Sequence, residues 1–330
     1  MTLNWAIIGT GFISNAAIDG IKRSDGSQLH SIYGRRPELV SEFQARHDIP
    51  HGSTDLDTAL TDPQVDAVYI GLPNHMHHEV AIKASQAGKA VLSEKSLTTT
   101  LVDANALLQA VSQSGTFFVE GLMYLAHPLL TRFTEVLRDG RLGALRSISG
   151  QYCADIWQVV NPKGMGTLYN LGCYPASLLH LTVQTMCGQD AFMQHQLQGF
   201  GNLNDDGTIC DAACSLRFEN GVLATLQSTD SYGKANAFSV IGEQGILSFV
   251  TNPWQPVGGR STMEWRPFEG NPELIHVDDP HDAFYHQTVL VELHVGRGEV
   301  EAARPSPRHN DSWEIMDFLT KWEASCRAAD

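Results

Sequence analysis

Short apolar runs alternate with amphipathic segments through residues 1–120 of the chain. The apolar runs are typical of strands buried on both faces of a parallel sheet, and they cover residues 3–8, 29–33, 65–70, 90–92 and 116–119. Between them, apolar residues recur at helical spacing, as at Ile13, Ala17 and Ile21. This alternation predicts an α/β fold with a parallel, doubly wound sheet of the Rossmann type.

From about residue 123 onward, the pattern changes to longer segments in which apolar and polar residues alternate. These segments cover residues 145–154, 192–200, 210–218, 222–230 and 237–249. They predict a large, mostly antiparallel open sheet, accompanied by a closing helix that begins near Asn310. We therefore expect two domains: a Rossmann dinucleotide-binding domain over residues 1–122, and an α+β domain for substrate binding and oligomerisation over residues 123–330.

Composition and charge narrow the class of protein. Hydrophobic residues make up 42% of the 330 residues and charged residues 18%, as in a soluble globular enzyme. The formal net charge of −15 argues against nucleic acid as a partner, because little positive charge is available to neutralise phosphates. No apolar run approaches the ~18 residues that span a bilayer, so we expect no membrane partner. The six cysteines include no Cys-x-x-Cys pair, which favours reduced thiols in a cytoplasmic protein.

A glycine turn and a helix follow the first strand, which is the context that a dinucleotide fingerprint requires. Gly9 would permit the tight turn, and Gly11 would let the backbone approach a pyrophosphate at the helix N-terminus. Phe12 and Ile13 then open the helix, and Ser14 occupies the third small position in place of glycine or alanine. The alternative is a glycine turn with a structural role only, but the strand and helix around it favour cofactor binding.

The second strand ends at Gly34-Arg35-Arg36. An NAD site usually has an acidic residue here for the ribose 2′-hydroxyl, whereas an arginine accommodates the 2′-phosphate of NADP. The acid is missing and two arginines follow, so we favour NADP, with NAD possible. The alternative is that both arginines are solvated loop charges.

A carboxylate and an ammonium, Glu94 and Lys95, appear together where the strand at residues 90–92 ends. Open α/β sheets bind their ligands outside the carboxyl ends of their strands. We therefore hypothesise that Lys95 lies where a nicotinamide ring meets its substrate.

Three neighbouring histidines, His75, His77 and His78, suggest a metal site at first sight. Tetrahedral zinc needs convergent ligands, and three histidines within one turn cannot all point inward. We predict no metal, and expect one imidazole to line the cofactor cleft.

These features, in this order, resemble the glucose-fructose oxidoreductase / inositol dehydrogenase (Gfo/Idh/MocA) family. The matching stretches are the glycine loop, Asp62 to Val68, Pro73-Asn74-His75-Met76-His77, Glu94-Lys95, and Glu120 to Tyr124 with His127-Pro128. In that family the Pro-Asn-x-x-His turn lines the cofactor cleft, and the lysine of a Glu-Lys-Pro motif contacts both substrate and cofactor. This chain has Ser96 in place of the proline, which removes a fixed φ but keeps the lysine.

The glycine-rich segment at residues 164–175 contains Asn170 and Tyr174, which would share one helical face. A helix cap followed by a packing tyrosine is the alternative. The family motif here resembles Gly-Gly-Gly-x-Leu-x-Asp-x-Gly-x-His/Tyr, whose aspartate and histidine or tyrosine act with the lysine in proton transfer. Tyr174 fits the last position, whereas Asn170 replaces the aspartate. An amide can orient a hydroxyl but cannot accept a proton at neutral pH.

The resemblance implies an NAD(P)-dependent dehydrogenase or reductase that acts on a secondary alcohol or carbonyl of a sugar, polyol, dihydrodiol or related cyclic alcohol. Lys95 and Tyr174 would transfer the proton, and Asn170 would orient the substrate. The expected cofactor contacts are Gly9, Gly11, Phe12, Ile13, Gly34, Arg35, Arg36, Leu72, Pro73, Asn74, His77, Glu94, Lys95 and Glu120. The expected substrate contacts are Lys95, Tyr124, Trp157, Lys163, Asn170 and Tyr174.

Two alternatives of other classes remain open. One is a non-catalytic NAD(P)-binding regulator, which the departures at Ser96 and Asn170 would suit. The other is a glycoside hydrolase that uses NAD for transient oxidation.

One face of the predicted antiparallel sheet is polar, and this face could be solvated or could be an interface. It carries Gln194, Gln196, Gln198, Thr225, Gln227 and Thr229. The family uses its open sheet face for dimerisation, so the resemblance implies a homo-oligomer, either a dimer or a tetramer.

Overall fold

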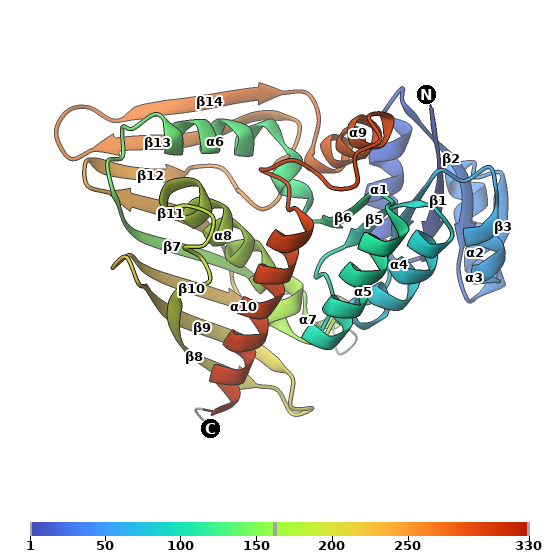
Figure 1. Ribbon diagram of the computed structural model, residues 1–330, viewed down its shortest axis with the longest axis horizontal. Helices are drawn as coiled ribbons and strands as arrows, with labels where there is room; N and C mark the ends of the chain where they lie inside the picture. Colours follow the sequence, from blue (N-terminus) through green and yellow to red (C-terminus); the bar gives the residue numbers. More distant parts are fainter. Residues whose placement is uncertain (1, 161–163, 329–330) are drawn as a thin grey trace. The chain divides into compact units, whose positions relative to one another are not determined.

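The computed structural model describes residues 2–160 and 164–328, which fold into two compact units (Figure 1). Unit 1 comprises Met1–Ala126 and Asp282–Trp313, and unit 2 comprises His127–His281 and Glu314–Asp330. No helix in the described ranges is both long and apolar enough to cross a bilayer.

Unit 1 is built on a six-stranded parallel sheet with the strand order β3-β2-β1-β4-β5-β6. Its strands are β1 (Leu3–Ile8), β2 (Ser27–Tyr33), β3 (His51–Ser53), β4 (Ala67–Ile70), β5 (Ala90–Glu94) and β6 (Phe118–Gly121). The chain winds outward from β1 in one direction and then from β4 in the other, so β1 and β4 form the switch point of a doubly wound sheet. The predicted Rossmann sheet is confirmed, and the short strand β3 is an addition to it.

Unit 1 also contains the following helices and helical turns. They are α1 (Phe12–Lys22), α2 (Pro37–His47), α3 (Leu56–Thr61), η1 (Asn74–Met76), α4 (His77–Gln86), α5 (Leu101–Ser114), η2 (Met123–Ala126) and α9 (Ala283–Gly296). The Thr100 side chain caps α5 by accepting a hydrogen bond from the Asp103 amide at 3.1 Å, and Gly115 ends the same helix in the left-handed conformation.

Residues 282–313 return to unit 1, which corrects the expected single boundary after residue 122. α9 packs against α1 so closely that a Cβ on Gly20 would lie 2.7 Å from the Phe284 carbonyl oxygen. Val291 of α9 and Ala302 belong to the same buried cluster as the core residues of β1. This return depends on tertiary packing, which a local sequence pattern does not reveal.

Unit 2 contains an eight-stranded sheet with the order β14-β13-β12-β11-β7-β10-β9-β8. Its strands are β7 (Leu145–Ala154), β8 (His195–Leu203), β9 (Ile209–Phe218), β10 (Leu223–Thr229), β11 (Lys234–Gly242), β12 (Gly245–Phe249), β13 (Gly259–Pro267) and β14 (Glu273–Asp279). Every neighbouring pair is antiparallel except β7 and β10, so the mostly antiparallel sheet is confirmed. The segment predicted at residues 237–249 is a hairpin of β11 and β12, and β13 and β14 were not predicted.

Helices cover one face of this sheet and leave the other open (Figure 1). They are α6 (Pro128–Arg138), the π-helical turn η3 (Leu168–Gly172), α8 (Cys173–Cys187) and α10 (His309–Ala328), whose first turn belongs to unit 1. The short helix α7 (Trp157–Val160) follows β7 in the chain. On the open face, Gln194, Gln196, Gln198 and Thr225 are exposed. Thr229 was expected on this face, but it is completely buried, and its hydroxyl donates a hydrogen bond to the Cys210 carbonyl at 3.0 Å.

Candidate functional site

A cavity of about 420 Å³ lies in unit 1, where β1, β2 and β4 end. The predicted cofactor contacts that line it are Gly9, Gly11, Gly34, Arg35, Arg36, Leu72 and Pro73. Thr10, Tyr33, Leu39, Gly71 and Met76 also line it and were not predicted. Most of these residues are sequence neighbours of a predicted residue. The sequence therefore identified the turns that line the cavity, but not every residue of those turns.

Gly9, which lines this cavity, has a backbone conformation that only glycine adopts readily. Its φ is +121°, and a Cβ there would lie 2.4 Å from the Gly71 carbonyl oxygen. The Gly9 amide donates to the Tyr33 carbonyl at 2.9 Å, and the Gly71 amide donates to the Ile8 carbonyl at 2.9 Å. The glycine turn therefore ties the end of β1 to the ends of β2 and β4.

Ser14 supports the same turn from below. Its side chain is fully buried, and its Oγ donates a hydrogen bond to the Gly9 carbonyl at 2.8 Å. A Cβ on Gly71 would lie 2.7 Å from that Oγ, so the serine fills the space beneath the turn. The departure from glycine or alanine at the third fingerprint position therefore adds a hydrogen bond without blocking the cavity.

Gly11 differs from Gly9, because no contact with the described residues requires a glycine there. Its φ is −85°, and a Cβ would meet only the Gly71 carbonyl oxygen, at an ordinary contact distance of 3.7 Å. No side chain caps the N-terminus of α1, which begins at the next residue. An uncapped helix N-terminus facing a cavity suits an anionic ligand. Phe12 (64% exposed) and Ile13 open the helix but are not lining residues of this cavity.

Two guanidinium groups stand where β2 ends. Arg35 and Arg36 are both exposed, and the Arg36 Nε lies 3.9 Å from Glu38 Oε1. No ion pair of Arg35 is found among the described residues. No acidic side chain lines the cavity in the described part of the chain. The charge at this end of the cavity is therefore positive.

His77 has a structural setting that differs from the predicted one. Its ring is completely buried, with Nδ1 2.9 Å from the Ser96 carbonyl oxygen and Nε2 2.8 Å from the Leu72 carbonyl oxygen. Burial lowers the pKa of His77 to about 4, against the opposing effect of the two carbonyls. The ring therefore joins the turn after β4 to the turn after β5 instead of lining the cavity, and neither nitrogen is exposed to bind a metal.

Lys95 follows directly on β5 and is half-buried. The next peptide bond, Lys95–Ser96, is cis. Its Ser96 carbonyl is held by His77, and the following Leu97 amide donates to Glu120 Oε1 at 2.7 Å. Side chains from β6 and α4 thus fix the backbone on the far side of the lysine, where the family has a proline.

Two buried carboxylates adjoin this turn. The Tyr69 hydroxyl donates to Glu94 Oε1 at 2.8 Å, and burial raises the pKa of Glu94 while the Lys95 charge opposes the rise. Burial also raises the pKa of Glu120, to about 7, against the opposing effects of the Ser312 hydroxyl and the Leu97 amide. The lysine therefore has two carboxylates near it that water does not solvate.

Asn170 lies in the turn η3 of unit 2 and is buried, with 3% of its surface exposed. Its Nδ2 donates a hydrogen bond of 2.7 Å to Oδ2 of Asp230, a residue that was not predicted. A Cβ on Gly164 would lie 2.1 Å from Asn170 Oδ1, so the glycine-rich entry leaves room for the amide. Position 170 therefore carries an amide, but a carboxylate lies beside it.

Tyr174, in the first turn of α8, is buried in an aromatic cluster of unit 2. Its ring packs edge-on against Tyr152, with 5.1 Å between centroids, and against Trp254 at 6.3 Å. Burial raises the pKa of Tyr152 to about 12. Tyr174 comes from the start of α8, and Asn170 from the π-helical turn before it.

The remaining predicted contacts differ in exposure. Asn74 and Tyr124 are buried in unit 1, and Trp157 is half-buried in α7. Lys163 lies outside the described residues.

Two family models match the chain. Residues 3–122 match the model of the oxidoreductase family with an NAD-binding Rossmann fold, and residues 131–248 match the model of the GFO/IDH/MocA C-terminal domain. The first match spans the parallel sheet of unit 1, and the second runs from α6 to β12 of unit 2.

The curated relatives include several oxidoreductases. An uncharacterized oxidoreductase of Rhizobium meliloti is 32% identical over 179 residues, which cover 52% of this chain and only 54% of that protein. The trans-1,2-dihydrobenzene-1,2-diol dehydrogenase of Bos taurus is 25% identical over 263 residues, 78% of this chain and 76% of the relative. The scyllo-inositol 2-dehydrogenase (NADP(+)) of Bacillus subtilis is 25% identical over 302 residues, 86% of each chain.

Solved structures share the fold over the whole length. A 3-ketoreductase from Actinomadura kijaniata, in complex with NADP and TDP-benzene, has a TM-score of 0.85 at 21% identity and covers 98% of both chains. An aldose-aldose oxidoreductase from Caulobacter crescentus, complexed with glycerol, has a TM-score of 0.84 at 20% identity, with 100% of this chain and 99% of that chain covered.

The two glycines of the turn should separate folding from binding. Gly9→Ala should destabilise the chain by about 3 kcal/mol, because the methyl meets the Gly71 carbonyl at a positive φ. Gly11→Ala should change the free energy of unfolding by less than about 1 kcal/mol, yet weaken NADPH binding about tenfold or more by blocking close approach of the backbone. Urea unfolding and a fluorescence titration with NADPH measure the two effects. Unchanged NADPH affinity in Gly11→Ala would contradict this account of the cavity.

Glu120 should make stability fall with rising pH. Because its pKa is raised from 4.5 to about 7 in the folded chain, the folded state holds more protons than the unfolded state between these values. Its contribution is therefore lost as pH rises through that window, by on the order of 3 kcal/mol. Glu120→Gln keeps an oxygen for the Leu97 amide and should flatten the pH dependence, measured by urea unfolding at a series of pH values. The exposed Glu79→Gln is the control. Parallel curves for wild type and Glu120→Gln would show that the raised pKa is wrong.

Proposed function

The chain belongs to the Gfo/Idh/MocA oxidoreductase family, and from this we propose that it transfers hydride between NADP(H) and a secondary alcohol or carbonyl of a sugar, polyol, dihydrodiol or related cyclic alcohol. The observation that carries the proposal is the cavity of unit 1, with its glycine turn at one end and its two arginines at the other.

The cavity residues suit a phosphorylated dinucleotide. The uncapped N-terminus of α1 and the bare backbone at Gly11 would hold the pyrophosphate. Arg35 and Arg36 would hold a 2′-phosphate, and the lack of an acidic lining residue in the described chain removes the partner that NAD needs for its 2′-hydroxyl. NADP is therefore favoured over NAD.

Lys95, Tyr174 and Asn170 would act on the substrate. Bound NADP⁺ supplies the hydride acceptor. When a substrate hydroxyl loses hydride to the cofactor, its proton would pass to the free amine form of Lys95 or the phenolate form of Tyr174, and the Asn170 amide would orient the hydroxyl. The buried Glu94 would position the lysine or the nicotinamide end of the cofactor. The family pattern supports these roles. Two structural features support them as well: His77 and Glu120 hold the backbone that follows Lys95, and Asn170 and Tyr174 lie in neighbouring turns of the chain.

The relatives support the substrate class. The bovine relative is named for a cyclic dihydrodiol and the Bacillus subtilis relative for an inositol and NADP(+). Both substrates are ring compounds with neighbouring hydroxyl groups. We extend this class, and the preference for NADP, to the present chain.

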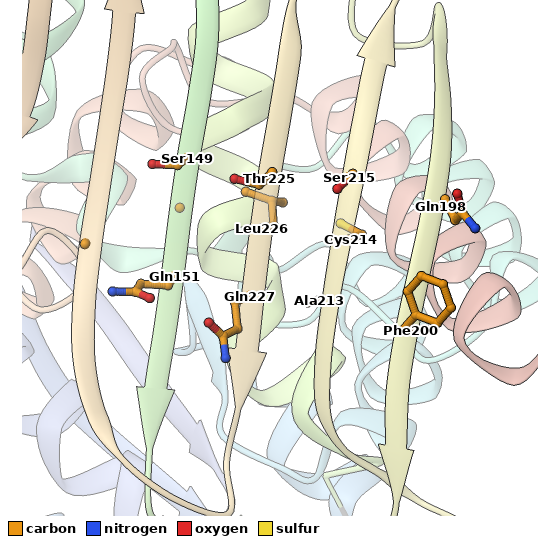
Figure 2. A pocket seen from close by; sticks show the side chains of 12 residues that line it. Ser149, Gln151, Gln198, Phe200, Ala213, Cys214, Ser215, Thr225, Leu226 and Gln227 are labelled. Atoms are coloured by element: carbon orange, nitrogen blue, oxygen red, sulfur yellow. The ribbon is translucent and has the colours of Figure 1, made fainter. Parts of the chain in front are cut away.

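We also propose that the open face of the unit 2 sheet joins copies of the chain into a homo-oligomer. A depression of about 420 Å³ on this face is lined by the polar side chains of Ser149, Gln151, Thr225 and Gln227, with the Phe200 ring at one side (Figure 2). Phe200 is 60% exposed and Leu223 of β10 is 53% exposed. A polar face with exposed apolar side chains is typical of a subunit interface.

All six cysteines are thiols, which supports a cytoplasmic location.

Arg35→Ala should weaken NADPH binding about tenfold or more and leave NADH binding nearly unchanged, because only NADPH carries the 2′-phosphate. Arg36→Ala should have the smaller effect, since that guanidinium already faces Glu38. Arg46→Ala, which removes the same charge outside the cavity, is the control. Fluorescence titrations measure each dissociation constant. Equal losses for NADPH and NADH in Arg35→Ala would contradict the preference for NADP.

A substrate panel tests the reaction itself. The purified protein is mixed with NADP⁺ or NAD⁺ and with scyllo-inositol, trans-1,2-dihydrobenzene-1,2-diol, glucose or xylose, and reduced nicotinamide is followed by absorbance. We expect turnover of at least one compound, faster with NADP⁺. Lys95→Met should lower kcat on the order of 100-fold, with a much smaller loss of NADPH affinity. Tight NADPH binding with no turnover of any compound would instead favour a non-catalytic regulator.

A further inference from the structure

Asn170 stands where the family pattern has an aspartate, and its amide cannot take the proton or carry the charge that an aspartate would. The structure brings a carboxylate from elsewhere in the chain to the same place. Asp230 follows β10 directly, sixty positions beyond Asn170, and its Oδ2 accepts a hydrogen bond from Asn170 Nδ2 at 2.7 Å. Asp230 is completely buried, so bulk water does not weaken this contact.

We propose that Asp230 is a positioning residue which supplies, through Asn170, the negative charge that the family pattern places at position 170. This proposal rests on the proposed function, because it assigns Asn170 to the substrate site. It adds a role for a residue that no sequence motif indicated.

The backbone around Asp230 holds it firmly in place. The Asp230 carbonyl accepts a hydrogen bond from the Ile156 amide at 3.0 Å, just before α7. Two positions earlier, the Ser228 hydroxyl lies 2.7 Å from Thr167 Oγ1, which joins the end of β10 to the residue before η3. The carboxylate and the turn that carries Asn170 are therefore joined at more than one point.

The hydrogen bond determines how the amide is presented. Because Nδ2 points toward Asp230, Oδ1 points away from it, toward Gly164. An amide oxygen can accept a hydrogen bond but cannot donate one. In its ionised form, Asp230 on the amide's donor side polarises the amide and makes Oδ1 a better acceptor for a substrate hydroxyl. In the proposed oxidation the C–H electron pair leaves as hydride and the O–H proton goes to Lys95 or Tyr174. Asp230 neither gains nor loses a proton.

The test compares three variants in the reaction with the panel compound that the wild-type protein turns over fastest. Asp230→Asn removes the charge but keeps a side chain whose oxygen can accept from Asn170. The swap Asn170→Asp with Asp230→Asn restores the family arrangement and reverses the same hydrogen bond. Asp211→Asn is the matched control, because Asp211 accepts a hydrogen bond from Asn202 at 2.9 Å in the same sheet, outside the site.

We expect Asp230→Asn to lower kcat on the order of 100-fold, with a much smaller change in KM and in NADPH affinity. The swap should recover most of the lost kcat, and Asp211→Asn should match wild type. A purely structural pair would behave otherwise, since Asp230→Asn and the swap conserve the hydrogen bond equally and would then have similar kcat values.

Two further outcomes separate this proposal from the function on which it rests. If wild type turns over a compound and Asp230→Asn does so equally well, the role of Asp230 is overturned and the function stands. If wild type binds NADPH but turns over none of the panel compounds, both are overturned.

Discussion

The close approach of Gly9 to the Gly71 carbonyl is the contact on which the cavity of unit 1 depends. A side chain at Gly9 would collide with that oxygen, and the backbone there has a positive φ. Because the two glycine amides bind the carbonyls of Tyr33 and Ile8, the ends of three strands meet at one point. The N-terminus of α1 and the arginines after β2 face the same cavity because these strands stop together.

Buried polar groups hold the proposed chemistry in place in both units. In unit 1, Glu94 and Glu120 lie out of water near Lys95, and the Tyr69 hydroxyl and the Leu97 amide offset part of the desolvation. In unit 2, Asn170 offsets the burial of Asp230. Burying carboxylates costs stability, and buried groups whose pKa is shifted, as it is raised for Glu94 and Glu120, gather at functional sites more often than elsewhere. Each unit, taken by itself, therefore contains a buried carboxyl group held by a hydrogen bond.

The parts that could be predicted from the sequence depend on residues close together in the chain. The glycine turn, Arg35 and Arg36, and Lys95 at the end of β5 are each specified by a few consecutive residues, as is the pattern of buried strands. The parts that could not be predicted depend on contacts between distant residues. Asp230 meets Asn170 across sixty positions, and α9 returns to pack on α1 from far along the chain. His77 was predicted to line the cavity from its place in a motif, but its two carbonyl contacts place it beneath the turns.

The most direct test of the central claim is to follow the hydride itself. NADPH carrying deuterium at C4 of the nicotinamide ring is incubated with the protein and the ketones that correspond to inositols, sugars and cyclic diols, and the products are analysed by mass spectrometry. Hydride transfer predicts an alcohol product that carries one deuterium on the former carbonyl carbon when the label is on the transferred face. Bound NADPH with no deuterium in any product, from either labelled face, would contradict the account.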